Sequence, residues 1–295
     1  MDKYLKGVFA PITTPFLRDE SVDYKGLKNN MQKYAKSGIA GYLALGSNGE
    51  NKSLTNEEKL EVLKVIVQNK SKSQVVMAGC IFESTIETVF YAKKMQEIGA
   101  DYITLLPPSY FKKEMTDDVL FQYFSDVADS VGIPCLVYNA PQFCGGTCLS
   151  VPLISRLAKH RNIVGIKDSS TGNIIDFLSA VKDQICVMAG SANFFLEALQ
   201  NGATGGVISL ANVFPELTND LYITFLENDI AKTIQINDRI LMLNKSVSGK
   251  GGVAAVKYAM DLAGYAGGKP RKPLFELPTD VKEELKQKLE EEKLI

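Results

Sequence analysis

The chain has 295 residues, of which 45% are apolar and 23% charged, and its formal net charge is -1. This length fits one large α/β domain or two smaller ones, and the composition is typical of a globular protein. The near-zero charge argues against a broad nucleic-acid or membrane surface, which needs clustered positive charge. No stretch has the length and apolarity of a membrane span, and the first six residues lack the apolar core of a signal peptide. We therefore expect a cytoplasmic protein with no nucleic-acid or membrane partner.

Strand-like and helix-like segments alternate along most of the chain. Capping-box sequences open two of the helical segments, at Thr55–Glu58 and Ser84–Glu87. Three joints share one plan, a helix end followed by Gly38, Gly99 or Gly202 and a short step into a strand, and each glycine can adopt the left-handed cap. The short apolar runs expected to form buried strands are Val8–Ile12, Gly41–Leu45, Val75–Ala78, Tyr102–Leu106, Pro134–Tyr138, Ile163–Lys167, Ile185–Ala189 and Gly206–Leu210.

Repeated strand–helix units predict an α/β protein with a (β/α)8 TIM barrel, which typically needs about 250 residues. We assign the barrel to residues 1–213 and expect residues 214–295 to form a C-terminal helical region packed on it. That last region contains no convincing strand. Its predicted helices are Glu216–Glu227, Ile230–Val247, Val253–Ala263 and Asp280–Leu294.

The cysteines and the single histidine narrow the possible chemistry. Five scattered cysteines fit reduced thiols, and the closest pair, Cys144 and Cys148, has no second pair or nearby histidine to complete a metal site. His160 lies after a helix and before a strand, which is the bottom face of a barrel, whereas barrel active sites lie at the C-terminal strand ends. We therefore predict no metal, and proton transfer in any active site must come from tyrosine, lysine or a carboxylate.

Lys167 is the leading candidate for a catalytic residue because it closes the apolar run 162–167. An ammonium group at the end of a buried strand is poorly solvated, and poor solvation lowers the pKa of a lysine. A neutral lysine attacks carbonyl groups and can form a Schiff base. The alternative is that Lys167 extends to the surface and serves only as a charge.

Two further groups lie at the expected C-terminal strand ends. Tyr138 ends the strand beside that of Lys167, where a phenol can relay a proton while its ring stays packed; the alternative is an ordinary core tyrosine. The turn Gly46–Glu50 places Ser47 and Asn48 between glycines, so its backbone N–H groups could bind a carboxylate or phosphate oxygen. The alternative is a simple connecting loop, for which this composition is common.

Four segments together resemble the family of dihydrodipicolinate synthase and N-acetylneuraminate lyase. They are Gly46–Glu50, Tyr138-Asn139-Ala140-Pro141, Gly165-Ile166-Lys167-Asp168 and Gly205-Gly206-Val207-Ile208-Ser209. The resemblance runs from about Gly7 to Leu277, in order and at the spacing of the family. It implies a class I, Schiff-base aldolase that acts on pyruvate and needs no metal or organic cofactor.

The resemblance also implies roles for individual residues. Lys167 matches the imine-forming lysine and Tyr138 the tyrosine that shuttles protons. Ser47 and Asn48 match the pair that holds the pyruvate carboxylate and completes the proton relay. Tyr110 corresponds to a tyrosine that the adjacent subunit supplies in the synthase. The resemblance therefore implies a homo-oligomer, either a dimer or a tetramer, and favours the tetramer. The backbones of Gly190 and Ile208, with Ser191 beside them, match positions that line the pyruvate site.

Phe143 departs from the synthase pattern. The synthase has an arginine there that binds the carboxylate of its aldehyde substrate, and a phenyl ring cannot make that bidentate contact. Asn48, where threonine is usual in the synthase, and the residues after Gly190 and Ile208 are similar to the 4-hydroxy-2-oxoglutarate aldolase branch. We therefore predict cleavage of a 4-hydroxy-2-oxo acid, such as 4-hydroxy-2-oxoglutarate or a 2-keto-3-deoxy sugar acid, to pyruvate and a small aldehyde.

Three alternatives to this reaction stay open. The first is 4-hydroxy-tetrahydrodipicolinate synthase, which condenses pyruvate with aspartate semialdehyde in lysine biosynthesis. The second is N-acetylneuraminate lyase. The third is a regulatory protein that binds pyruvate without turnover, against which the joint presence of Lys167, Tyr138 and the Ser47–Asn48 turn argues.

Overall fold

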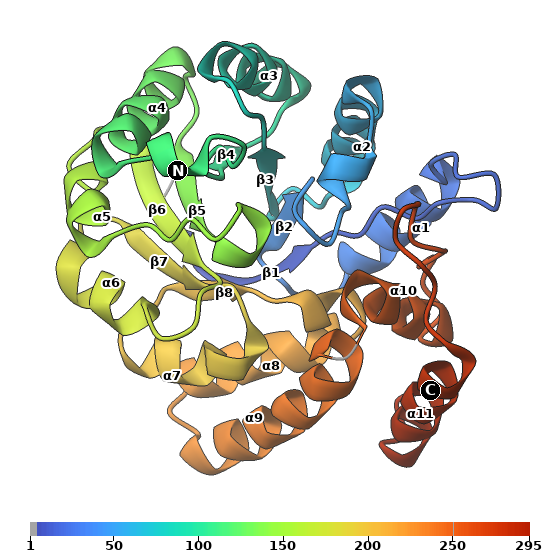
Figure 1. Ribbon diagram of the computed structural model, residues 1–295. Coiled ribbons are helices and arrows are strands. Elements are labelled where there is room, and N and C mark those ends of the chain that lie inside the picture. The colour runs from blue at the N-terminus through green and yellow to red at the C-terminus, as the bar shows by residue number, and fades with distance from the viewer. Residues whose placement is uncertain (1–4, 250) are drawn as a thin grey trace. The chain divides into compact units, whose positions relative to one another are not determined.

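The computed structural model describes residues 5–249 and 251–295 (Figure 1). Residues 1–4, which belong to the segment compared above with a signal peptide, lie outside the described residues. The strands follow one another from β1 to β8 in a closed barrel, so the predicted fold class is confirmed. Within the described part of the chain, no helix has the length and apolarity required to cross a membrane.

The strands lie close to the predicted runs, and the eight helices α1 to α8 follow them in turn. The strands are β1 (Gly7–Pro11), β2 (Gly41–Ala44), β3 (Val75–Cys80), β4 (Tyr102–Leu105), β5 (Cys135–Asn139), β6 (Ile163–Asp168), β7 (Cys186–Ala189) and β8 (Gly205–Val207). The helices are α1 (Tyr24–Tyr34), α2 (Asn56–Asn69), α3 (Thr85–Ile98), α4 (Asp117–Ser130), α5 (Val151–Leu157), α6 (Ile174–Val181), α7 (Phe195–Gln200), α8 (Pro215–Leu226), α9 (Ile230–Asn244), α10 (Gly252–Leu262) and α11 (Thr279–Glu291).

The predicted helix ends are largely confirmed. Thr55 accepts a hydrogen bond from the Glu58 backbone while the Glu58 carboxylate accepts one from the Thr55 backbone, which completes the capping box of α2. Ser84 caps α3 by accepting from the Glu87 backbone. The three joint glycines have φ values of 79° (Gly38), 105° (Gly99) and 101° (Gly202), the left-handed conformation that glycine adopts without steric cost.

Strand β8 is shorter than predicted, because residues 209–212 form a 3-10 helix instead of continuing the strand. The Ile208 amide still donates to Phe9 O at 2.9 Å in the manner of a parallel ladder. The next acceptor along β1, Pro11 O, is bound instead by the Asn212 side-chain amide at 2.9 Å. A side chain therefore takes the hydrogen bond that a longer strand would have used.

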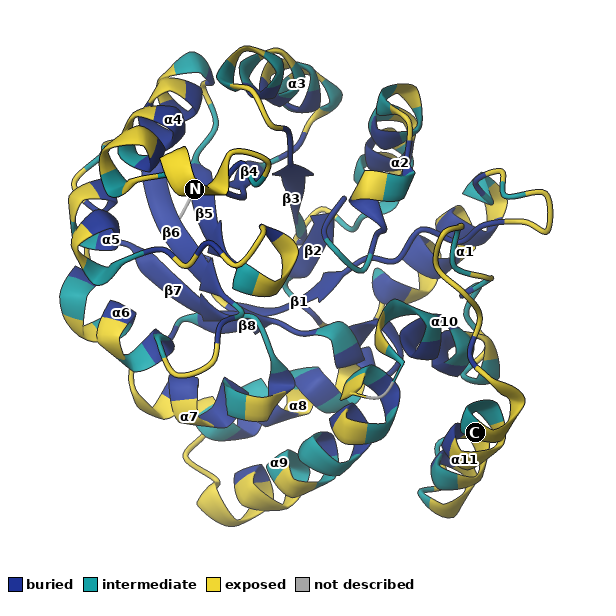
Figure 2. Ribbon diagram, viewed as in Figure 1, coloured by how far each residue is buried: buried dark blue, intermediate teal, exposed yellow. Residues whose placement is uncertain are grey.

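Residue contacts divide the chain into two compact units, which are described separately: Met1–Gly7 with Val75–Val207, and Val8–Gln74 with Ile208–Ile295. In the first unit β3 to β8 pair in parallel with their sequence neighbours, and the strands are buried (Figure 2). Tyr138 is the register partner of Lys167, and Asn139 that of Asp168. This register places the ends of β5 and β6 side by side.

In the second unit the 3-10 helix Ser209–Asn212 and the C-terminal helical region are both bonded to α1. Tyr34 donates its hydroxyl to Asn212 O at 2.6 Å, and the Asn30 side chain donates to Ala266 O at 2.8 Å. The helix predicted for 230–247 is interrupted, because α9 ends at Asn244 and a π-helical turn occupies Lys245–Gly249. Glycines at and beyond the end of this turn lower helix propensity there. The domain boundary at residue 213 stays a prediction.

Candidate active site

Lys167 lies near the end of β6 with only 5% of its surface exposed. Its Nζ is 3.9 Å from the centroid of the Tyr138 ring, so the amine faces the aromatic ring of its register partner. Among the described residues no carboxylate forms an ion pair with Lys167. The predicted burial of this lysine beside Tyr138 is confirmed.

Tyr138 has a packed ring and a polar tip. The residue is 3% exposed and belongs to an apolar cluster with Ile81, Leu106, Ala140 and Cys144. Its hydroxyl lies 3.3 Å from Ser169 Oγ, which is also 3.3 Å from Gly190 O. A chain of oxygens therefore leads from the phenol to the end of β7, and a phenol in such a chain can pass a proton.

Ser169 was not among the predicted site residues. The signal available in the sequence was its place, since it directly follows Lys167-Asp168 where β6 ends. Asp168 points to the opposite side of the strand from Lys167. It is fully buried, its Oδ1 accepts from the Asn139 side chain at 2.8 Å and from Ser170 Oγ at 2.7 Å, and burial raises its pKa. Asp168 thus connects the ends of β5 and β6 outside the lysine–tyrosine face.

Gly190 permits a close approach between β6 and β7. Its amide donates to Asp168 O at 2.6 Å, and a Cβ added to it would lie 1.9 Å from Ser169 Oγ. No larger residue fits unless Ser169 and the backbone move. The predicted neighbour Ser191 caps the 3-10 helix Ala192–Phe194, where its hydroxyl accepts from Asn193 N at 3.2 Å, so its side chain has a structural task.

Tyr110 and Phe143 present aromatic side chains to the exterior of the first unit, with exposures of 81% and 51%. The backbone before the Tyr110 ring is held by Glu83, whose carboxylate accepts from Ser109 N at 2.8 Å and from Tyr110 N at 2.9 Å. Glu83 follows β3 and was not predicted, because nothing in its local sequence indicates a partner 26 residues away. Phe143 ends the 3-10 segment Pro141–Phe143.

The Gly46–Glu50 turn belongs to the second unit. The amides of Gly49 and Glu50 donate to Gly46 O at 3.1 Å and to Ser47 O at 3.0 Å, so these two N–H groups close the turn. The expectation of an anion nest is therefore wrong for these two amides. Ser47 and Asn48 are half-buried, and the Asn48 side chain donates to Ser209 Oγ at 2.7 Å. Ile208 is fully buried, with its amide on Phe9 O.

His160 has structural partners and lies before β6, at the opposite end of the strand from Lys167. Its Nδ1 accepts from Asn162 N at 3.2 Å, and its Nε2 is 3.6 Å from Asp129 Oδ2. The prediction that this histidine lies away from the strand ends is confirmed. Among the described residues no group of three histidine, cysteine or carboxylate side chains could hold a metal ion.

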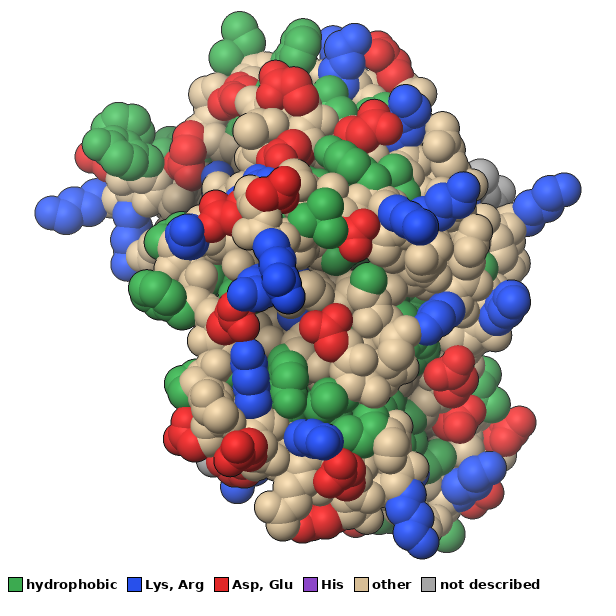
Figure 3. All heavy atoms as spheres, turned by 90° about the vertical axis from the view of Figure 1, so that its right-hand side faces the viewer, with side chains coloured by type: hydrophobic (Ala, Val, Ile, Leu, Met, Phe, Trp, Pro, Cys, Tyr) green, Lys and Arg blue, Asp and Glu red, His purple; other side chains and the backbone are tan. Residues whose placement is uncertain are grey.

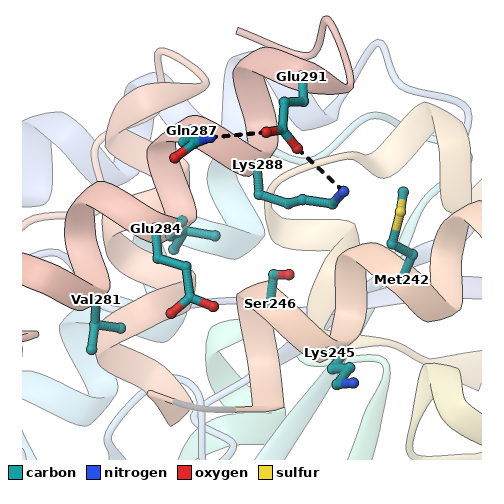
Figure 4. A pocket seen from close by; sticks show the side chains of 9 residues that line it. Met242, Lys245, Ser246, Val281, Glu284, Gln287, Lys288 and Glu291 are labelled. Carbon is teal, nitrogen blue, oxygen red and sulfur yellow. Dashed lines mark hydrogen bonds and ion pairs between the residues drawn. The ribbon is translucent and has the colours of Figure 1, made fainter.

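A hollow of about 500 Å³ lies at α9, the π-helical turn and α11 in the second unit (Figure 4). Its polar groups bind one another, as Gln287 donates to Glu291 at 3.0 Å and Lys288 pairs with Glu291 at 3.5 Å. The face drawn in Figure 3 carries acidic and basic side chains in alternation, without a field of one sign. Neither feature gathers charge of one sign.

The chain matches the model of the dihydrodipicolinate synthetase family over residues 4–292. It is 32% identical over 293 residues to the 4-hydroxy-tetrahydrodipicolinate synthase of Archaeoglobus fulgidus, with 98% of this chain and 99% of the relative covered. The same enzyme of Methanothrix thermoacetophila is 32% identical over 289 residues, with 96% of each covered.

Solved structures agree with these sequence relatives. The prophage protein YagE from E. coli K12, of the dihydrodipicolinic acid synthase family and solved with pyruvate, aligns with a TM-score of 0.92 at 27% identity and covers 99% of each chain. A dihydrodipicolinate synthase from Acinetobacter baumannii, also solved with pyruvate, gives 0.92 at 29% identity, with 98% of this chain and 99% of that chain covered. The fold, the buried lysine on β6 and these relatives together define a class of Schiff-base lyases. The chain belongs to the dihydrodipicolinate synthetase family and is a pyruvate-dependent carbon–carbon lyase of the class I aldolase type.

Proposed function

We propose that this enzyme binds pyruvate as an imine on Lys167 and joins it to, or releases it from, a small aldehyde. The observation that carries the proposal is the buried Lys167 amine, 3.9 Å from the Tyr138 ring and without an ion-pair partner among the described residues. Family membership and the pyruvate complexes of two relatives support it.

The chemistry follows from the two side chains. The Lys167 amine adds to the keto carbon of pyruvate and water leaves, which gives an iminium ion. Its positive charge makes the methyl group acidic, and loss of a proton forms an enamine that adds to an aldehyde carbonyl. Tyr138 is in place to move protons during these steps, with Ser169 Oγ 3.3 Å from its hydroxyl. Cleavage runs through the same steps in reverse.

The remaining roles rest on the family pattern. We propose that Ser47 and Asn48 bind the pyruvate carboxylate, that Gly190 and Ile208 line the pyruvate site with backbone groups, and that Tyr110 acts in the active site of a partner subunit. The last role supports a homo-oligomer, and its support in this chain is the 81% exposure of Tyr110 on backbone held by Glu83. Sedimentation of the purified protein tests it, and a monomer would contradict it.

The second substrate has two candidates. The relatives at about 30% identity are named 4-hydroxy-tetrahydrodipicolinate synthase, which favours condensation with aspartate semialdehyde over the cleavage that the sequence analysis preferred. One cation lies near the loop of Phe143, because a Cβ on Gly146 would be 2.8 Å from Lys112 Nζ. An ammonium group can replace arginine as a point charge for a carboxylate. We therefore place the synthase reaction first.

Cleavage of a 4-hydroxy-2-oxo acid remains the second candidate because of Phe143. Its half-exposed ring occupies the place of the carboxylate-binding arginine of the synthase and suits a less charged aldehyde. A panel of 4-hydroxy-2-oxo acids, with aspartate semialdehyde plus pyruvate as the condensation assay, separates the two reactions. Release of pyruvate from a member of the panel, without condensation of aspartate semialdehyde, would favour the cleavage reaction over the synthase reaction.

Borohydride reduction in the presence of pyruvate tests the shared step. We expect a covalent adduct on Lys167 and none on Lys257, a second buried lysine whose Nζ is 2.5 Å from Glu50 Oε1. Lys167→Ala serves as the control and should remove the adduct. Absence of an adduct from the wild-type protein at saturating pyruvate would refute imine catalysis and favour a regulatory protein or an unrelated reaction.

A further inference from the structure

A second buried lysine, on α10, is bonded to the turn that carries Ser47 and Asn48. The side chains of Lys257 and Glu50 are 0% and 1% exposed, and Lys257 Nζ is 2.5 Å from Glu50 Oε1. The same ammonium donates to Lys269 O at 2.8 Å and lies 4.4 Å from the centroid of the Phe16 ring. Burial lowers the pKa of Lys257, while the facing carboxylate of Glu50 opposes that shift.

Arg271 occupies the other oxygen of the same carboxylate. Its backbone N–H donates to Glu50 Oε2 at 2.8 Å, and its guanidinium makes a bidentate pair with Glu58, the N-terminal capping-box residue of α2, at 2.6 and 2.7 Å. Arg271 also donates to Ser53 O at 2.8 Å, just beyond the turn. Both carboxylate oxygens of Glu50 are therefore held by the C-terminal region, and the Glu50 side chain is almost fully buried.

Glu50 needs such support because of its backbone. Its φ of 52° and ψ of 43° are left-handed, a conformation that costs free energy for any residue with a Cβ. The turn ends on this residue, since the Glu50 amide donates to Ser47 O at 3.0 Å. Thr14 Oγ1 fixes the preceding carbonyl, Gly49 O, at 2.8 Å. The Glu50 backbone is thus bonded to Ser47, three residues earlier in the same turn.

We propose that Lys257 and Arg271 are positioning residues that, through Glu50, hold the Gly46–Glu50 turn in the shape that binds the pyruvate carboxylate. The effect on pyruvate binding rests on the proposed function, whereas the ion pair and hydrogen bonds of Glu50 support the effect on the turn itself. Neither residue needs to touch the substrate. They keep the Ser47 and Asn48 side chains where they can bind the pyruvate carboxylate. A displacement of these side chains by about 1 Å would weaken that binding.

The test compares Lys257→Met with Arg239→Met. Arg239 pairs with Glu292 at 3.5 Å and, among the described residues, forms no hydrogen bond or ion pair with the turn, so its variant controls for loss of one cation. Hydrogen–deuterium exchange without substrate should rise at least tenfold for the peptide spanning 46–53 in Lys257→Met and stay unchanged in Arg239→Met. The pyruvate concentration for half-maximal borohydride trapping on Lys167 should also rise about tenfold, with the maximal extent of trapping retained.

The double variant Lys257→Met/Glu50→Gln removes both charges. It serves as the test if Lys257→Met alone fails to fold, because a buried ion without its partner strongly destabilises the folded state. The double variant should show the same faster exchange. Unchanged exchange of the turn in a folded variant overturns the inference. A wild-type protein that forms no adduct refutes the proposed function instead, and the exchange measurement then still decides whether the turn is held by Lys257.

Discussion

Replacing Gly190 with alanine should disturb the packing between the ends of β6 and β7 while leaving the Lys167 amine unchanged. The added Cβ would lie 1.9 Å from Ser169 Oγ, 2.9 Å from Ser169 Cβ and 2.6 Å from Asp168 O. Rotation of the Ser169 hydroxyl relieves only the first contact, and it breaks the approach of Ser169 Oγ to Tyr138. The other two contacts require β7 to move from the end of β6.

The cost of this substitution follows from those contacts. Overpacking of this kind costs about 1–3 kcal/mol, which for a chain of this size lowers Tm by roughly 2–10 °C. Displacement of the proton-relay oxygens by about 1 Å should lower kcat on the order of 10²-fold. Imine trapping on Lys167 should persist, because the amine itself is untouched. Gly132→Ala is the matched control, since its Cβ would meet only Gln96 atoms at 3.6 Å or more.

Differential scanning calorimetry, steady-state kinetics and borohydride trapping measure the three effects. A Gly190→Ala protein with unchanged Tm and a kcat within about threefold of wild type would refute the claim that catalysis depends on the close approach of β6 and β7. Loss of trapping at full stability would instead place Gly190 in imine formation.

Three further predictions concern the same unit of the chain. Tyr138→Phe should keep imine trapping and lower kcat by about 10²–10⁴-fold, and equal loss of trapping would contradict a proton-transfer role. Glu83→Ala removes the acceptor of the Ser109 and Tyr110 amides, and hydrogen bonds to a charged group are worth about 1.5–3 kcal/mol. Turnover should therefore fall while imine trapping on Lys167 stays. Unchanged turnover would show that the loop carrying Tyr110 is not part of the active site. For Asp168 the raised pKa means that the folded state binds the proton more tightly than the unfolded chain. The contribution of this proton to stability is therefore present near and below the ordinary value of 3.8 and is lost as the pH rises through the folded-state pKa. The wild type should gain stability relative to Asp168→Asn as the pH falls from 7 to 4, and a pH-independent difference would contradict the shift.

The fold was predictable because its signals are local. Apolar runs of strand length, capping residues and the three joint glycines each report on a few neighbouring residues, and these small signals repeat around the barrel. The exact register of β5 against β6 is not local, because it shifts between Cys135 and Leu136 before Tyr138 pairs with Lys167. At the end of β8 the Asn212 side chain donates the hydrogen bond that a backbone amide would otherwise donate, and there the local pattern predicted the wrong strand end.

The contacts around the site were predictable only in part. Tyr138 and Lys167 lie one residue before the ends of β5 and β6, so their positions were readable from the local pattern. Ser169 and Glu83 act through hydrogen bonds to residues on other strands, and a serine or glutamate in a loop has many common uses. The two amides of the Gly46–Glu50 turn illustrate the converse error, because glycines suggested free N–H groups and the turn consumes them.

Lys167 and Lys257, two of the buried lysines, show why burial alone does not identify a nucleophile. Lys257 is the more deeply buried, yet the Glu50 carboxylate at 2.5 Å favours its charged form, and its partner lies 207 residues away, beyond the reach of any local pattern. Lys167 instead faces the Tyr138 ring at 3.9 Å, and among the described residues no carboxylate forms an ion pair with it. Lys257 is thus held in an ion pair, whereas the Lys167 amine faces an aromatic ring. A lysine at a strand end facing an aromatic ring is thus a stronger indication of carbonyl chemistry than a lysine that is merely inaccessible.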